Sequence, residues 1–130
     1  MLDWRTMSEM LFWIYLLNAV VLINHEIDSA YWKEWELFRL PGGVTGFLLL
    51  HFPILLFVLY GLVQVREGTR TGLVFSLILA GGGIFAFVIH SWFLRRGREE
   101  FKSAISRAIL YMTLVLSVIQ ASVTLSFLLG

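Results

Sequence analysis

The chain has 130 residues, of which 58% are hydrophobic and only 15% are charged. Soluble domains have about 45–50% apolar and about 25% charged residues, and a domain this small cannot bury so large an apolar excess. The composition therefore excludes an ordinary soluble protein and predicts one that is solvated by lipid. Ten Lys and Arg against nine Asp and Glu give a net charge of +1, so no basic excess indicates nucleic acid as a partner. Because the sequence has no cysteine, disulfides and thiolate metal sites are excluded as well.

Four apolar stretches are long enough to cross a bilayer, which takes about 20 residues per helix. We predict membrane helices over residues 10–29, 44–65, 71–94 and 104–129, within a single integral membrane domain of residues 1–130. The connections between them are short, so helices that follow each other in sequence should be antiparallel. The predicted fold class is all-α, an up-down-up-down transmembrane four-helix bundle.

Residues 31–40, between the first two predicted helices, combine aromatic and charged side chains. Trp32, Trp35 and Phe38 suit a short amphipathic segment that lies in the headgroup region of the membrane. Pro41 and the two glycines after it should turn the chain back into the bilayer. We predict an interfacial aromatic anchor here, with a lid that contacts substrate as the alternative.

Lysine and arginine are unequally divided between the two ends of the predicted bundle. Three of them lie at the end that holds the N-terminus and the second connection: Arg5, Arg66 and Arg70. The other seven lie at the opposite end: Lys33, Arg39, Arg95, Arg96, Arg98, Lys102 and Arg107. Because cytoplasmic connections carry the excess of basic residues, we predict that both termini face away from the cytoplasm.

Each of the first three predicted helices carries one histidine, and this topology places all three in the cytoplasmic leaflet. They are His25, His51 and His90. Asp28 follows His25 by three residues and shares its helical face, whereas Glu26 points about 100° away. Buried carboxylates cost several kcal/mol unless they are paired, protonated or bound to a metal, so these acidic residues indicate a functional site.

Imidazole and carboxylate are ligands that suit zinc and, after zinc, non-haem iron or manganese. We predict that His25, Asp28, His51 and His90 bind one such ion and that Glu26 is a general base. A membrane-embedded hydrolase of a lipid or an isoprenoid would follow, with metal-dependent oxidation as the next choice, because a metal lowers the pKa of bound water to about 7. Two alternatives stay open: a haem protein with two histidine ligands, and a non-catalytic accessory subunit.

Small and polar residues inside the helices have two interpretations each. The fourth predicted helix has a polar face, made by Ser106, Thr113, Ser117, Gln120 and Thr124. Such residues usually stabilise helix packing in lipid, and the alternative is that they line a polar cavity. Gly81, Gly82 and Gly83 also favour close packing, with room for a ligand tail beside Gly83 as the alternative. Partners are expected to be membrane lipids, and either a homo-oligomer or a larger membrane complex is compatible with the small-residue patterns.

Several of these residues together resemble a known type of sequence. The run His25-Glu26-Ile27-Asp28, the pair Glu34-Trp35 and the run His51-Phe52-Pro53 look like an uncharacterised bacterial family of small integral membrane proteins. The resemblance covers about residues 22–56. It implies four membrane helices, a bacterial inner-membrane location and no known activity. That family tends to have a paired histidine in its third helix, whereas His90 here has no histidine one turn away.

Overall fold

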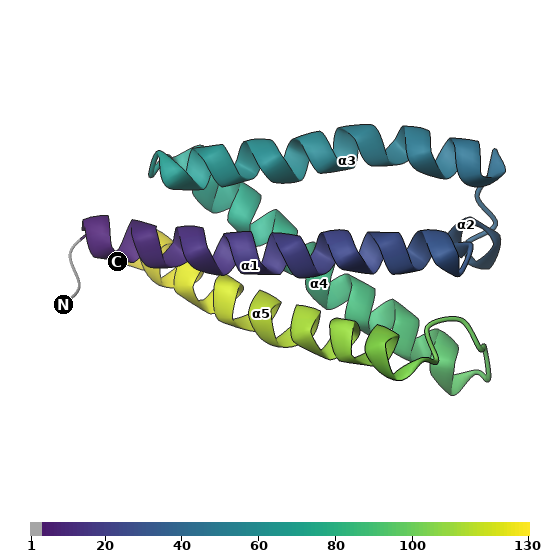
Figure 1. The fold of residues 1–130 in the computed structure, drawn as a ribbon. Coiled ribbons are helices and arrows are strands. Elements are labelled where there is room, and N and C mark those ends of the chain that lie inside the picture. Colours follow the sequence, from purple (N-terminus) through teal and green to yellow (C-terminus); the bar gives the residue numbers. More distant parts are fainter. Residues whose placement is uncertain (1–3) are drawn as a thin grey trace.

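The computed structural model describes residues 4–130, and the secondary structure in this range is entirely helical (Figure 1). Four long helices make the bundle: α1 (Trp4–Tyr31), α3 (Gly43–Arg66), α4 (Arg70–Arg95) and α5 (Ala104–Leu129). A single short turn of helix, α2 (Glu34–Leu37), lies between α1 and α3. All four long helices are long and apolar enough to cross a membrane, and only helices and closed barrels satisfy the backbone there. The predicted four-helix bundle is confirmed.

The helices pack so that α1 lies between α3 and α5, and α4 contacts both α3 and α5. The start of α1 and the end of α5 lie at one end of the bundle, and α2 and the α4–α5 connection lie at the other (Figure 1). Within the described residues α1 already begins at Trp4 rather than at residue 10. The other three long helices begin and end within one residue of the predicted bounds.

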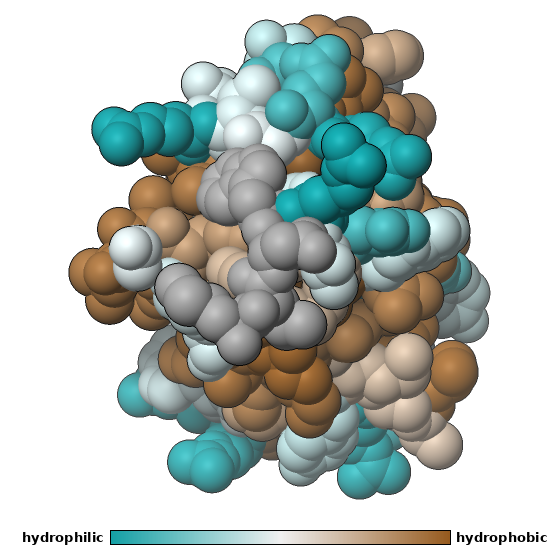
Figure 2. Space-filling view, turned by 90° about the vertical axis from the view of Figure 1, so that its left-hand side faces the viewer, coloured by the Kyte–Doolittle hydropathy of each residue, from teal (hydrophilic) through white to brown (hydrophobic). Residues whose placement is uncertain are grey.

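The surface of the bundle is apolar, as expected for a protein that lipid surrounds. Figure 2 views the end where α1 begins and α5 ends; brown apolar side chains cover much of the molecule, and hydrophilic ones gather in the upper part, toward the α3–α4 connection, and along the lower edge. Many large hydrophobic residues are exposed, for example Phe52 at 73% and Leu56 at 70%. This arrangement supports a membrane location because such a surface would drive aggregation in water.

The interior of the bundle is instead partly polar. Asn18 Nδ2 donates hydrogen bonds to Ser117 Oγ and Gln120 Oε1, at 3.0 and 2.9 Å. Gln120 Nε2 donates in turn to the carbonyl and hydroxyl oxygens of Ser76, and that hydroxyl lies 2.8 Å from Thr124 Oγ1. All five residues are fully buried. The network joins α1, α4 and α5, so the polar face of α5 packs inside the bundle as predicted.

The three consecutive glycines of α4 have different environments. A Cβ atom on Gly83 would overlap Ser117 Oγ and come within 2.9 Å of Thr113 Cγ2, so α4 and α5 are in close contact there. A Cβ atom on Gly81 or Gly82 would meet no atom within 4 Å. Gly83 therefore serves close packing of α4 against α5 and leaves no room for a ligand, whereas free space exists beside Gly81 and Gly82.

We expect Gly83→Ala to destabilise the bundle by about 1–3 kcal/mol, because the added methyl group must displace Ser117 from its hydrogen bond to Asn18. Gly81→Ala is the matched control and should be neutral or stabilising, since alanine is the better helix former by about 1 kcal/mol. The measurement is thermal unfolding of the purified protein in detergent. Equal melting temperatures for the two variants would contradict the close contact at Gly83.

Candidate metal site

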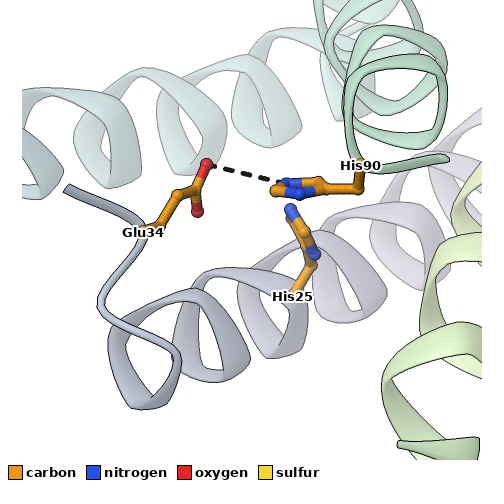
Figure 3. Close-up of side chains that lie close together, drawn as sticks. All are labelled: His25, Glu34 and His90. Carbon is orange, nitrogen blue, oxygen red and sulfur yellow. Dashed lines mark ion pairs between the residues drawn. The ribbon is translucent and has the colours of Figure 1, made fainter. Parts of the chain in front are cut away.

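Three side chains that can bind metal converge at the end of the bundle that holds α2. One ligand atom each from His25, Glu34 and His90 can be chosen so that all three lie within 4.8 Å of one another. His90 Nε2 is 3.6 Å from Glu34 Oε1, and the two imidazole rings are 4.8 Å apart between centroids. Figure 3 shows them converging from α1, from the start of α2 and from α4. Residues far apart in sequence are thus brought to one point.

The turn before α2 brings Glu34 to this point. Lys33 has φ 52° and ψ 53°, a left-handed conformation that costs a residue with a side chain about 1–2 kcal/mol. This conformation reverses the chain directly after α1, so that Glu34 returns toward His25, nine residues earlier. Leu37 holds α2 in place, because it is buried in a cluster with Phe101 and Leu110.

Aromatic rings enclose the two histidines. The ring centroid of Phe101 is 4.1 Å from that of His90 and 5.7 Å from that of His25, and Phe38 lies 6.2 Å from His90. Phe101 itself is only 1% exposed and has φ 65°, so a strained backbone is retained where its ring covers the site. His25 and His90 are 2% and 1% exposed. The enclosure removes water from the histidines, which strengthens any electrostatic interaction there.

Several polar atoms of this group have no partner of their own. Among residues 4–130, His25 Nδ1, His90 Nδ1 and Glu34 Oε2 are buried and make no hydrogen bond. Each such atom costs about 1–3 kcal/mol if nothing satisfies it, so the donor set fits a bound ion. The 4.8 Å spacing is wider than the roughly 3.3 Å between ligands of tetrahedral zinc, so an ion would draw the side chains inward.

The charge state of Glu34 depends on its surroundings. Burial raises the pKa of this carboxyl to about 7; the nearby Ser29 hydroxyl and, less strongly, His51 oppose the rise, whereas the neighbouring Glu26 adds to it. Glu34 belongs to α2, outside the four membrane-length helices, and its side chain is 16% exposed. A cation at His25 and His90 would favour the ionised carboxylate, since an opposite charge nearby stabilises that form.

His51 and Glu26 form a separate pair beside this group. His51 Nε2 lies 2.6 Å from Glu26 Oε2, and His51 Nδ1 lies 2.7 Å from the carbonyl oxygen of Phe47, one turn earlier in α3. A carbonyl oxygen only accepts, so Nδ1 donates to it. The contact between His51 Nε2 and Glu26 Oε2 also needs a hydrogen-bond donor, so a second proton must be present on Nε2 or on the carboxyl group of Glu26. The pair is therefore an imidazolium with a carboxylate or a neutral imidazole with a carboxylic acid.

The predicted ligands are distributed over both groups. The structure brings His25 and His90 together, and it places His51 with Glu26, the predicted general base. Asp28 Oδ2 is buried without a hydrogen-bond partner among residues 4–130. The metal-binding roles of His51 and Asp28 remain predictions, and His51 would have to release Glu26 to bind an ion.

Sequence reasoning missed Glu34 as a candidate ligand. The sequence pattern of its segment predicts an interfacial anchor, although Glu34-Trp35 is part of the resemblance to a family of membrane proteins. A charged residue next to aromatic anchors is ordinary at a membrane surface, so composition gave no reason to place it inside. Only the turn at Lys33 brings it to the histidines.

Comparison with known proteins gives a family and no relative of established function. No curated protein and no solved structure matches the chain. One family model does match, over residues 11–127, and it is described as a family of unknown function. The match covers all four long helices almost completely and includes every residue of the two groups described above. The chain therefore belongs to this family of unknown function, DUF6713.

Proposed function

We propose that this protein is a membrane-embedded metalloenzyme in which His25, Glu34 and His90 bind one divalent ion, zinc in the first place. The observation that carries the proposal is the buried convergence of these three residues from three separate elements, with unpartnered nitrogen and oxygen atoms. Two histidines and one carboxylate are a ligand set of catalytic zinc sites, which keep a further position open for water.

The reaction that suits such a site is hydrolysis of a lipid or an isoprenoid. When bound, the ion supplies a water molecule with a pKa near 7, which is a nucleophile at neutral pH. Glu26 is the residue proposed to take the proton from this water. It adjoins His25 in sequence, and it lies close enough to Glu34 to influence the pKa of that carboxyl. His51 orients Glu26 through the 2.6 Å contact.

A second candidate reaction has support from the same ligand set. Two histidines and one carboxylate also hold non-haem iron in oxygenases, so iron-dependent oxidation of a lipid follows hydrolysis in order of preference. Haem has less support, because the His25 and His90 rings touch edge to face at 4.8 Å and leave no space for a macrocycle between them.

The first test is the metal content of the purified full-length protein. We expect about one zinc ion per chain by elemental analysis, with no visible absorbance, because zinc has a filled d shell. Iron with absorbance in the visible range would favour oxidation instead. A protein that retains no transition metal, even after dialysis against zinc, would contradict the proposal and favour a non-catalytic subunit.

We also propose that the candidate metal site faces the cytoplasm of a bacterial cell, with both termini outside. Seven of the ten lysines and arginines lie in or next to the connections at the end of the bundle where α2 lies. Reporter fusions at Gly97, in the α4–α5 connection, and at Gly130 should therefore report opposite sides, with Gly97 inside. A cytoplasmic reporter at Gly130 would overturn the orientation and leave the metal proposal untouched.

A further inference from the structure

An apolar groove runs along the bundle between α1, α3 and α4 and ends at Glu26. It has a volume of about 200 Å³ and is lined by eleven residues, of which Glu26 is the only polar one. An apolar cavity of about 150 Å³ is large enough to bind benzene, so this groove has room for a stretch of hydrocarbon. From Ile78 to Ala86 it follows α4 for about 12 Å.

The groove leads directly to the candidate metal site. Its lining residues Leu22 and Ala86 lie three and four residues before His25 and His90, which is about one helical turn. Glu26, at the same end, is 31% exposed and hydrogen-bonded to His51. A chain lying in the groove would therefore present its polar end to Glu26 and to the metal ligands.

Gly82 keeps the groove open. It lines the groove, and a Cβ atom there would meet no other atom within 4 Å. The neighbouring Gly81 has equally free space but does not line the groove. A larger side chain at Gly82 would thus fill the groove, whereas the same side chain at Gly81 would not.

The polar end of the occupant must donate a hydrogen bond. The hydrogen bond with His51 involves Oε2 of Glu26, and no other side chain among residues 4–130 hydrogen-bonds to Glu26. The other carboxyl oxygen is an acceptor whichever of the two residues carries that proton. An ionised carboxylate headgroup has no proton to donate to this oxygen, so a neutral hydroxyl group is the better match.

We infer that this groove binds a single-chain lipid with an uncharged, hydroxyl-bearing headgroup, namely a fatty-acid monoester of glycerol, which hydrolysis with one water molecule would split into a fatty acid and glycerol; a long-chain alcohol is its non-hydrolysable analogue. The inference rests on the proposed function, because it names the substrate class of that site. The chain lies in the groove, and the headgroup donates to Glu26 next to the metal ligands.

The test uses the full-length protein in phosphatidylcholine nanodiscs with a diazirine-bearing hexadecanol as the photoaffinity probe. We expect photolabelling of the α1 and α4 segments around Glu26 and Gly82 that unlabelled hexadecanol competes away. Gly82→Leu should reduce this labelling about tenfold, because the leucine side chain displaces several methylene groups. Gly81→Leu should label like the wild type.

An apolar depression between α1 and α5, lined by Leu17 and Met112 among others, is the internal reference for ordinary lipid contact. The inference would be overturned if the groove and this depression were labelled equally and unlabelled hexadecanol did not compete at either. It would also be overturned if Gly82→Leu had no effect on the labelling. Palmitate should compete about tenfold less well than hexadecanol, since its ionised headgroup has no proton to donate to Glu26. Equal competition by palmitate would overturn the headgroup assignment.

Metal content measured on the same samples separates the two proposals. Specific labelling of a protein that binds no metal would support the groove and refute the metalloenzyme. Normal metal content with only non-specific labelling would refute the groove and leave the metalloenzyme standing. Gly82→Leu should keep its metal, because Gly82 lies eight residues, or two turns of α4, from His90.

Discussion

Replacing His90 by alanine is expected to abolish metal binding, whereas replacing His51 by alanine is expected to leave it intact. His90 lies 3.6 Å from Glu34 and in ring contact with His25, so His90→Ala removes one of three converging ligands. Loss of a residue that only supports a ligand costs about 10–100-fold in metal affinity, and loss of a ligand itself costs more. The measurement is zinc per chain after gel filtration, together with a competition titration against a chelator.

His51→Ala is the matched control because it also removes a nearly buried imidazole from the same end of the bundle. Both ring nitrogens of His51 already have partners, in Phe47 and Glu26, so the ion does not depend on them. Helical content by circular dichroism should stay unchanged in both variants. Loss of zinc from His51→Ala as well would show that His51 is a fourth ligand, the role that the sequence predicts for it.

The fold could be predicted from the sequence because lipid imposes one strong rule. Every backbone polar group must be satisfied inside the membrane, so four long apolar stretches become four helices with short connections. The bounds of α3, α4 and α5 are correct to one residue for this reason. The polar face of α5 could also be predicted, since its spacing puts Ser117, Gln120 and Thr124 on one side of a helix.

The candidate site was predictable only in part, because it depends on how each helix is rotated and on one unusual turn. The predicted topology places the three histidines at a similar depth along the bundle, and the contact between His25 and His90 agrees with this expectation. The rotation of α3, which pairs His51 with Glu26, is set by packing against α1 and α4 and leaves no periodic signal. The left-handed conformation of Lys33 has no signal either, since such turns usually use glycine. Glu34 was missed because its position follows from that turn.

The neighbouring glycines of α4 illustrate the same limit. Successive residues of a helix point about 100° apart, so Gly82 and Gly83 face different neighbours although they are identical in sequence. Gly83 meets Ser117 of α5, and Gly82 lines the groove that ends at Glu26. The run of glycines indicated both close packing and room for a ligand, and only the tertiary structure assigns each role to a residue.

Glu26→Gln is expected to preserve the fold and the bound metal while hydrolysis falls by about 10²–10⁴-fold, the usual contribution of a general base. The amide introduced by Glu26→Gln keeps the shape of the side chain, and its nitrogen can donate to Nε2 of a neutral His51. Nδ1 of His51 then still donates to Phe47, so the hydrogen bonds of the pair survive without the carboxylate. The measurement is release of palmitate from monopalmitoylglycerol by the zinc-loaded protein.

Glu36→Gln is the matched control, because Glu36 is a glutamate of α2 whose side chain is 64% exposed and forms only a weak surface contact with Lys33. It should hydrolyse the ester like the wild type. Loss of zinc from Glu26→Gln to the same extent as from His90→Ala would make Glu26 a metal ligand and leave the base unassigned. Undiminished hydrolysis by Glu26→Gln, with full metal content, would instead give the Glu26–His51 pair a purely structural role, since the amide preserves its contacts and removes only the ability to accept a proton from water.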